Sequence, residues 1–295
     1  MSPPQNRSSV LTMSLDGRIE QLESWVRERQ SVLVAYSGGV DSTFLAAVAF
    51  RALGDHAIAV TADSAIYPTE ETRKAGEIAK SIGIRHRVVQ TRELDRPQFA
   101  ENGPLRCYHC KQELFAKLFD IAEAEGLRCV IDGRHEDDRT DFRPGAKAAR
   151  ELGIESPLAD LQFTKEEIRT LSRALGLPNW DKPAHPCLST RFAYGMKITE
   201  DRLDRVDDAE AFLRSLGVGE LRIRQHGEIA RVEVRPEDFH LFIDPNTGPR
   251  IVDALKTRGG YRYVTLDLEG FRSGSMNEVL VQGGWTHERR VKEST

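Results

Sequence analysis

The chain has 295 residues, of which 39% are hydrophobic and 30% are charged, and its formal net charge is −4 at pH 7. This balance is typical of a folded protein and excludes the compositions of disordered and membrane chains. A chain of this length is expected to form two domains. The slightly acidic balance argues against a broad basic surface for extended nucleic acid and favours a small substrate.

The sequence has no stretch that approaches the roughly 18 apolar residues of a membrane helix, and residues 1–10 lack the apolar core of a secretory signal. We therefore predict a cytoplasmic location. The four cysteines are Cys107, Cys110, Cys129 and Cys187. Without a secretory signal they are expected to be reduced thiols rather than a disulfide framework, so one of them can be chemically active.

The first part of the chain alternates between strand and helix patterns. Residues 1–13 are polar and predict a disordered tail, and residues 15–28 predict a short amphipathic helix. Apolar runs of strand length then alternate with helical segments; the strands are 31–36, 57–62, 85–90 and 128–132, and the helices are 41–53, 69–82 and 109–125. This alternation predicts an α/β fold with a doubly wound parallel sheet, whose strands end at one edge where ligands bind.

Three further segments follow. Thr164 and Glu167 predict a capping box for a helix that ends before Gly176, and this helix closes a first domain spanning residues 14–178. Residues 179–197 predict a loop that carries Cys187. Residues 198–290 predict a smaller α+β domain for substrate binding or oligomerisation; its predicted elements are a helix at 200–216, strands at 221–225 and 230–234, two short helices and a strand at 261–268.

A loop of small residues joins the first strand to the next helix. It consists of Ser37, Gly38, Gly39, Val40, Asp41 and Ser42. In such a loop, backbone N–H groups and the helix N-terminus can surround an anion, and Asp41 is placed to hold Mg²⁺ on a polyphosphate. A Walker A loop would need a lysine, and its absence here argues against γ-phosphoryl transfer. A plain Gly-Gly turn is the alternative.

In this context the segment SGGVDS resembles the PP-loop of the N-type ATP pyrophosphatases, which include NAD and GMP synthetases, argininosuccinate synthetase and tRNA-thiolating enzymes. The resemblance implies binding of ATP and its cleavage between the α- and β-phosphates to form an adenylate. In that superfamily the end of the next strand contacts adenine. By position alone, this implies a base site at Ala62, Asp63 and Ser64.

Cys187 lies in a proline-containing loop with Lys182, His185 and Arg191 close by in sequence. Nearby cations lower the pKa of a thiol and increase its thiolate fraction near neutral pH. A small buried cysteine is the alternative, but polar and basic neighbours are poor core material. We therefore interpret Cys187 as a catalytic nucleophile.

Longer segments make the resemblance specific. Residues 106–111 (RCYHCK), 132–158, 186–195 (PCLSTRFAYG) and 270–278 (GFRSGSMNE) are similar to the ATP-dependent sacrificial sulfur transferases of the LarE type. The resemblance implies that ATP, with Mg²⁺, adenylates a carboxylate of pyridinium-3,5-biscarboxylic acid mononucleotide. The Cys187 thiolate then displaces AMP, and cleavage of its Cβ–S bond leaves a thiocarboxylate and dehydroalanine.

The same resemblance places the reaction in biosynthesis of the nickel-pincer nucleotide cofactor of lactate racemase, and it implies a homo-oligomer, specifically a hexamer. It leaves the base for the elimination unidentified, with His185 as the candidate. Asp132 and the acidic residues at 136–138 follow a predicted strand end, where a carboxylate can contact Mg²⁺ or ribose.

Arg222 and Arg224 alternate with apolar residues on a short predicted strand, so both guanidinium groups project from one face. Arginine offers planar bidentate donors to phosphate, which suits a mononucleotide substrate. A solvated, charged strand face is the alternative. The resemblance adds Arg272 to this phosphate site, and it makes Glu210 and Glu233 candidate metal ligands around it.

Three alternatives stay open. Cys107 and Cys110 have C-x-x-C spacing without a second pair to complete a zinc site, so RCYHCK is interpreted as a helix start that packs near the nucleotide. The alternative is that Cys187 joins them, as in relatives that use three cysteines to hold an iron–sulfur cluster and recycle sulfur. A tRNA-thiolating PP-loop enzyme would need an RNA-binding surface. A non-catalytic nucleotide-binding regulator would need neither the Cys187 loop nor the arginine strand.

Overall fold

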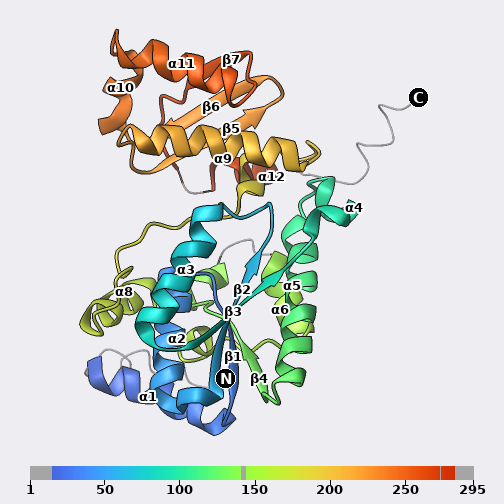
Figure 1. Cartoon of the computed structure of the whole chain (residues 1–295), viewed down its shortest axis with the longest axis vertical. Helices are drawn as coiled ribbons and strands as arrows, with labels where there is room; N and C mark the ends of the chain where they lie inside the picture. Colours follow the sequence, from blue (N-terminus) through green and yellow to red (C-terminus); the bar gives the residue numbers. More distant parts are fainter. Residues whose placement is uncertain (1–14, 141–143, 273, 283–295) are drawn as a thin grey trace, which may run out of the picture. The chain divides into compact units, whose positions relative to one another are not determined.

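The computed structural model describes residues 15–140, 144–272 and 274–282 (Figure 1). The predicted tail at 1–13 and the end of the predicted C-terminal domain at 283–290 lie outside the described residues. Two compact units are present: the first runs to Thr91 and resumes over Tyr108–His185, and the second contains Arg92–Cys107 and the chain from Pro186 onward.

The first unit is built on a parallel sheet of four strands. They are β1 (Val32–Ala35), β2 (Ala57–Asp63), β3 (Arg85–Gln90) and β4 (Cys129–Ile131), in the spatial order β3-β2-β1-β4. Each neighbouring pair is parallel, which confirms the predicted sheet. β4, the strand that carries Cys129, lies at an edge of the sheet, although Cys129 itself is buried.

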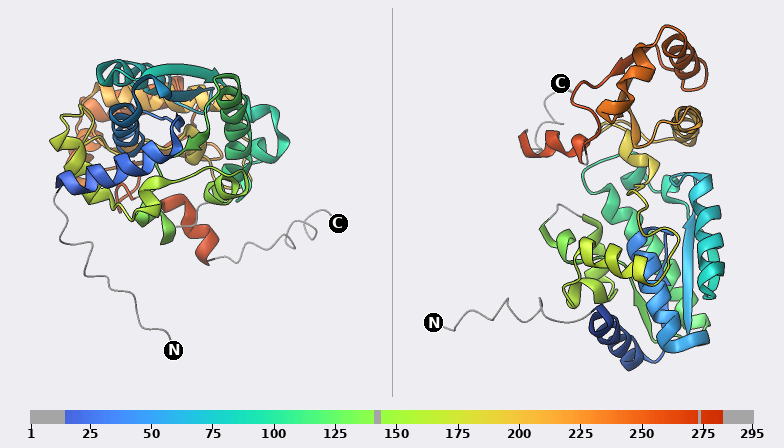
Figure 2. Two further views of the ribbon diagram at one scale, coloured as in Figure 1. Left: turned by 90° about the horizontal axis from the view of Figure 1, so that it is seen from below. Right: turned by 90° about the vertical axis from the view of Figure 1, so that its left-hand side faces the viewer.

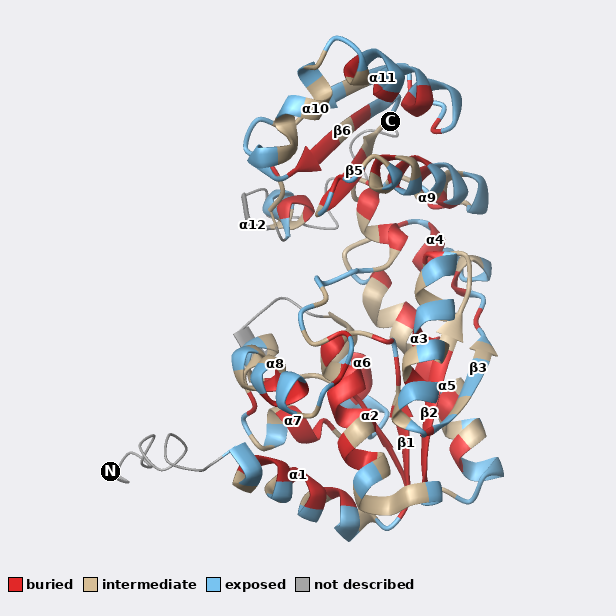
Figure 3. Ribbon diagram, turned by 60° about the vertical axis from the view of Figure 1, so that its left-hand side comes forward, coloured by how far each residue is buried: buried red, intermediate tan, exposed pale blue. Residues whose placement is uncertain are grey.

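Helices cover both faces of this sheet (Figure 2). One face packs against α1 (Leu15–Arg29), α2 (Val40–Leu53), α3 (Thr69–Ile82) and α8 (Lys165–Ala174), and the other packs against α5 (Arg106–Ala124) and α6 (Pro144–Glu151). The cause is the alternation of side chains along each strand. On β1, Val32 and Val34 join the first cluster and Leu33 joins the second. Figure 3 shows β1 and β2 as buried strands.

The start of α8 is fixed by the predicted capping box. The Thr164 side chain accepts from the backbone N–H of Glu167 at 3.2 Å, and the Glu167 carboxylate accepts from the backbone N–H of Thr164 at 2.8 Å. Ile168 and Leu171 bury the apolar face of the helix. The capping box and the buried apolar face therefore hold the backbone of the first turn of α8 in a fixed position.

The second unit contains a mixed sheet of three strands, β5 (Leu221–His226), β6 (Ile229–Val234) and β7 (Tyr263–Leu266). β5 and β6 are antiparallel, and β6 and β7 are parallel. Its helices include α9 (Glu200–Ser215), α10 (Phe239–Ile243), α11 (Thr247–Thr257) and α12 (Glu278–Gln282). These elements match the predicted small α+β region. Across the described ranges, no helix combines the length and apolarity needed to cross a bilayer.

The division between the units differs from the predicted boundaries at 178 and 197. Residues 92–107 were expected in the first domain, but they bond to the chain after Pro186. The Asn102 side chain donates to the Ala193 carbonyl at 2.8 Å, and the backbone N–H of Ile198 donates to the Ala100 carbonyl at 2.8 Å. Contacts over about ninety residues leave no periodic signal in the sequence, so the boundary could not be predicted from local pattern.

Candidate active site

The phosphate loop runs from the end of β1 into α2, as predicted. Gly39 is the N-cap of α2, and no side chain caps this helix start. The Ser42 hydroxyl lies 3.1 Å from the Ser37 hydroxyl, and it accepts from the backbone N–H of Ser37 at 3.2 Å. The helix thus begins with uncapped backbone donors inside a closed loop, which is the arrangement that binds phosphate.

Gly38 is required at its position for two reasons. Its φ of +68° lies in the left-handed region, and a Cβ atom there would lie 2.8 Å from the Cβ of Ala75 in α3. Glycine alone avoids both costs. The loop is therefore held in one conformation by close packing on α3.

We expect Gly38→Ala to destabilise the protein by about 2–4 kcal/mol and to weaken ATP binding at least tenfold, because the loop must shift away from α3. The measurements are chemical unfolding and calorimetric titration. Gly176→Ala is the matched control, since Gly176 has a φ of +69° with nothing within 4 Å of its added Cβ. Equal losses in the two variants would refute the packing argument.

Two side chains from the segment after α8 donate hydrogen bonds to the Gly38 carbonyl of the phosphate loop. The Asn179 amide donates to the Gly38 carbonyl and to the Thr43 hydroxyl, both at 3.0 Å. The Lys182 ammonium donates to the same carbonyl at 3.2 Å and pairs with Glu71 at 2.6 Å. Neither contact was predicted from the sequence. Lys182 was instead expected to activate Cys187. In the structure Lys182 supports the phosphate loop.

Asp41, the predicted Mg²⁺ ligand, lies in the first turn of α2 and pairs with a lysine from α8. The Lys165 ammonium is 2.6 and 2.7 Å from the two carboxylate oxygens of Asp41. Protein Mg²⁺ sites commonly use one or two carboxylates together with substrate phosphates, so this partly exposed carboxylate fits the role. The described residues contain no cluster of three or more potential metal ligands.

At the predicted base site at the end of β2, the Asp63 side chain is already hydrogen-bonded within the protein, whereas the Ser64 side chain is not. Asp63 accepts from Thr72 at 3.1 Å and from Gln90 at 2.7 Å, so both its oxygens are engaged. The Ser64 hydroxyl is buried and makes no hydrogen bond to the described part of the chain. Ala62 is half-buried beside them. Ser64 therefore has spare hydrogen-bonding capacity, and base contact by these three residues stays a prediction.

The end of β4 packs directly on the phosphate loop. A Cβ added to Gly133 would lie 3.0 Å from the backbone nitrogen of Ser42. Asp132 accepts from Ser156 at 2.6 Å and from Arg134 at 2.9 Å. Its carboxylate is thus already bound within the protein, and its role in Mg²⁺ or ribose contact stays a prediction.

Cys187 is half-buried and immediately precedes the 3-10 helix η5 (Leu188–Arg191). The Thr190 hydroxyl donates to the Cys187 carbonyl at 2.9 Å, and the Arg191 guanidinium donates to the carbonyls of Pro186 and Cys187 at 2.8 and 3.2 Å. These donors fix the backbone at the cysteine. The thiol is therefore carried by an ordered turn.

Arg191 is completely buried, which the sequence did not suggest. It pairs with Glu210 through two hydrogen bonds of 2.9 Å. Glu210 also accepts from Arg214 at 2.6 Å and from the backbone of Ile223 at 3.1 Å. Burial alone would raise the pKa of Glu210, but the charges and hydrogen bonds of the arginines outweigh burial and lower it to about 2. This ion pair locks η5 onto α9 and β5.

The predicted phosphate-binding arginines are buried, which excludes the alternative of a solvated strand face. Arg222 and Arg224 are 4% and 5% exposed. Arg224 bonds to Glu233 at 2.9 Å and to the Thr190 carbonyl at 3.1 Å, while Arg222 lies over the Phe271 ring. Burial, reinforced by the nearby positive charge of Arg191, lowers the pKa of Arg222 to about 10. An anion bound here would neutralise part of the positive charge that these buried arginines bring together.

Glu210 and Glu233, the two carboxylates predicted as metal ligands, already accept hydrogen bonds from arginine side chains. Glu233 is fully buried and accepts from Arg224, from Arg231 at 3.0 Å and from Ser275 at 2.7 Å. Glu210 has the arginine partners described above. A metal ion would have to displace buried guanidinium groups from both, so the geometry favours structural ion pairs over metal ligation.

Arg272 does not share these partners. It pairs with Glu269 at 2.8 Å and Glu278 at 3.5 Å, and more distantly with Asp267 at 3.9 Å. Asp267 also contacts Arg231, which in turn contacts Glu233. Arg272 is therefore linked to the buried arginines through other side chains, and its place in the phosphate site stays a prediction.

None of the four cysteines, all of which lie in the described ranges, forms a disulfide. Cys107 and Cys110 lie in the first turns of α5. The Cys129 thiol donates to Glu155 at 3.0 Å, and burial together with that carboxylate raises the pKa of Cys129 well above its usual range. Cys129 is therefore an unreactive structural thiol.

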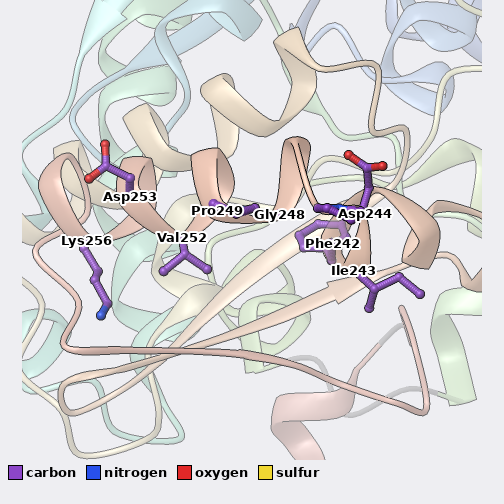
Figure 4. Close-up of a pocket in the computed structure, with 9 residues that line it drawn as sticks. Phe242, Ile243, Asp244, Gly248, Pro249, Val252, Asp253 and Lys256 are labelled. Atoms are coloured by element: carbon purple, nitrogen blue, oxygen red, sulfur yellow. The ribbon is translucent and has the colours of Figure 1, made fainter.

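The second unit also has an open pocket of about 600 Å³ between α10 and α11 (Figure 4). Its lining includes Ile243, Val252 and Lys256, and it includes none of the predicted site residues. It offers no thiol and no arginine. We therefore assign the chemistry to the phosphate loop and to the Cys187 turn.

The parallel sheet, together with the Gly-Gly loop that leads into a helix with an aspartate in its first turn, defines a PP-loop enzyme that uses ATP. In agreement, residues 16–113 match the family model described as NAD synthase. An uncharacterized protein of Synechocystis sp. is 46% identical over 91% of this chain and 100% of its own length. An uncharacterized protein of Methanocaldococcus jannaschii is 29% identical over 83% and 92%, respectively.

The pyridinium-3,5-bisthiocarboxylic acid mononucleotide synthase of Lactiplantibacillus plantarum is 40% identical over 87% of this chain and 92% of its own length. The chain belongs to this family, the LarE-type sulfur transferases, which confirms the resemblance noted in the sequence.

Proposed function

We propose that the chain converts carboxylates of pyridinium-3,5-biscarboxylic acid mononucleotide to thiocarboxylates, using ATP for activation and Cys187 as the sulfur source. The relative from L. plantarum is named for the bisthiocarboxylic acid product. The observation that carries the proposal is that Cys187 shares one scaffold with the buried arginines. Thr190 binds the Cys187 carbonyl, and Arg224 binds the Thr190 carbonyl.

Activation is assigned to the first unit. The substrate carboxylate attacks the α-phosphorus of ATP, the bond to the bridging oxygen breaks, and pyrophosphate leaves with the electron pair. Backbone N–H groups of the phosphate loop hold the polyphosphate, and Asp41 would hold Mg²⁺, which supplies charge neutralisation when it is bound. Asn179 and Lys182 keep the loop in shape through the Gly38 carbonyl.

Sulfur transfer is assigned to Cys187 in the second unit. Its thiolate attacks the acyl carbon, and AMP leaves with the electron pair to give a thioester. A base then removes the Cα proton of Cys187, the Cβ–S bond breaks, and the electron pair passes to sulfur. The products are a thiocarboxylate and a dehydroalanine residue. His185, the candidate base, lies 4.0 Å from Glu71 in the first unit.

Substrate binding is assigned to Arg222 and Arg224, whose buried positive charge is suited to the phosphate of a mononucleotide. Arg191 is a positioning residue, because Glu210 occupies its guanidinium group and its remaining donors hold the Cys187 turn. The proposed end use is the nickel-pincer nucleotide of lactate racemase, in a homo-oligomeric enzyme.

The test is incubation of the protein with ATP, Mg²⁺ and the mononucleotide, with AMP and thiocarboxylate measured by liquid chromatography and mass spectrometry. We expect both products, and we expect the dephosphorylated nucleoside to require at least a tenfold higher concentration because it lacks the phosphate. AMP formation without thiocarboxylate would contradict the proposal. Salt-sensitive retention of tRNA would instead favour a tRNA-thiolating enzyme.

Cluster-dependent sulfur transfer, known in relatives of the same family, is the alternative to the sacrifice of Cys187. Cys107 and Cys187 both belong to the second unit, and Arg106, next to Cys107, lies 5.3 Å from the ring of Tyr194 in the Cys187 segment. This mechanism would require Cys107, Cys110 and Cys187 to bind an iron–sulfur cluster that carries a replaceable sulfur, but Cys110 belongs to the first unit and the described residues contain no group of three potential metal ligands. Anaerobic purification of a brown protein with cluster absorbance would favour this mechanism, whereas a colourless active protein would favour the sacrifice of Cys187.

A further inference from the structure

Arg106, the first residue of α5, is a buried cation without an acidic partner. It is 5% exposed. Across the described ranges its guanidinium group makes one hydrogen bond, from Nη1 to the side-chain oxygen of Asn102, and its buried Nε makes none. The ring of Tyr194 is its other neighbour, with the ring centre 5.3 Å from the guanidinium carbon. The positive charge of Arg106 is therefore not balanced by an ion pair with the described part of the chain.

Two other buried arginines of the second unit do have counter-ions. Arg191 pairs with Glu210 and Arg224 pairs with Glu233, each at 2.9 Å. Buried charges are paired in this way because an unpaired one is strongly destabilising. Arg106 departs from this rule, and the N-terminus of α5, whose first turn holds no acidic residue, adds a partial positive charge beside it. Both features favour an anion that the chain itself does not supply.

Asn102 fixes the position of the Arg106 side chain. It is fully buried and has a φ of +56°, in the left-handed region that residues other than glycine seldom adopt. Its amide group donates to the carbonyls of Phe192 at 3.3 Å and Ala193 at 2.8 Å. Its own backbone carbonyl accepts from the N–H of Gly195 at 3.1 Å. The side-chain oxygen that accepts from Arg106 is therefore held rigidly against the segment that follows Cys187.

The same segment also carries contacts to the proposed phosphate site. Arg224 donates to the Thr190 carbonyl at 3.1 Å, and the backbone N–H of Ala193 donates to the carbonyl of Gln225 at 3.4 Å. Arg224 and Arg106 are thus attached to one short stretch of chain within the second unit. A mononucleotide with carboxylates on its ring has a phosphate at one end and carboxylates at the other. Two separate cationic groups on one scaffold suit such a molecule.

We propose that Arg106 binds a carboxylate of the pyridinium ring while Arg222 and Arg224 bind the phosphate. The inference rests on the proposed mononucleotide substrate and adds the residue that recognises its ring carboxylate. The guanidinium group suits this role because it offers planar donors to a carboxylate. The carboxylate bound by Arg106 is the one that is not adenylated, because an ion-paired carboxylate is the weaker nucleophile. Arg106 is then a specificity-determining residue.

The test is calorimetric binding of nicotinic acid mononucleotide and nicotinamide mononucleotide, which differ only in a carboxylate against an amide. Native protein should bind the acid about tenfold or more tightly than the amide, as expected for a hydrogen bond between charged groups. Arg106→Gln should lose this preference and should change binding of the amide by about threefold or less. Arg106→Lys should show a smaller preference than native protein, because an ammonium group lacks the planar pair of donors.

Arg262→Gln is the matched control, because Arg262 also lies over a tyrosine ring, that of Tyr263 at 5.7 Å, but is exposed; it should keep the full preference. Equal weakening of both ligands by Arg106→Gln would indicate a structural or phosphate-binding role and would overturn the proposal. Should Arg106→Gln fail to fold, a full native preference in Arg106→Lys would overturn it.

The failure of this inference is distinguishable from the failure of the proposed function. If native protein formed thiocarboxylate from the dicarboxylate mononucleotide but bound the acid and the amide equally, only the role of Arg106 would fall. If native protein bound neither mononucleotide and formed no thiocarboxylate, the proposed substrate would fall as well.

Discussion

Cys187→Ala is expected to abolish thiocarboxylate formation, with a loss of at least about 1,000-fold, because no other group in the turn can donate sulfur. AMP formation in the first turnover should persist, since the groups assigned to adenylation belong to the other unit. The measurement is rapid-quench analysis of AMP and thiocarboxylate in the same samples.

Two further cysteine variants make this result specific. Cys129→Ala is the matched control, because Cys129 is buried in β4 and bonded to Glu155, so sulfur transfer should continue. Cys107→Ala separates the mechanisms: a sacrificed Cys187 retains transfer in this variant, whereas a cluster-dependent enzyme loses it. Thiocarboxylate production by Cys187→Ala at the native rate would remove Cys187 from the reaction.

Glu210→Gln should destabilise the protein by about 3–5 kcal/mol, because it leaves Arg191 as a buried charge without its counter-ion. The measurement is the free energy of unfolding in denaturant. Glu228→Gln is the matched control, since Glu228 pairs with Arg262 at 3.5 Å on the exposed surface and should cost about 0.5 kcal/mol or less. A loss below about 1 kcal/mol for Glu210→Gln would contradict the locking role of the pair.

The pH dependence of this effect follows from the lowered pKa of Glu210. The pKa is about 2 in the folded protein against an ordinary value of 4.5. A carboxyl group with a lowered pKa stabilises the fold fully above its unfolded pKa, and this stabilisation is lost as the pH falls through the folded pKa. The stability difference between native protein and Glu210→Gln should therefore be constant from about pH 7 to pH 5 and shrink below about pH 4.5.

The parts of the structure that depend on local pattern could be predicted. Alternating strands and helices gave the parallel sheet, and Thr164 with Glu167 gave the start of α8. The phosphate loop was recognisable because small residues, an aspartate and the strand–helix context are all local. The small mixed sheet followed from the apolar alternation around Arg222 and Arg224.

The partners of charged residues could not be predicted, because they come from distant segments. Lys165 meets Asp41 from 124 residues away, and Asn179 reaches Gly38 from 141 residues away. Arg191 looked like a solvated loop cation that activates Cys187, but it is fully buried against Glu210.

Mass spectrometry of the intact protein, with peptide mapping, tests the central claim most directly. The protein would be incubated with ATP, Mg²⁺ and the pyridinium mononucleotide. The account predicts loss of the elements of H₂S at Cys187, with one thiocarboxylate group formed for each chain converted. An unchanged mass after several thiocarboxylate groups had formed per chain would contradict the sacrifice of Cys187.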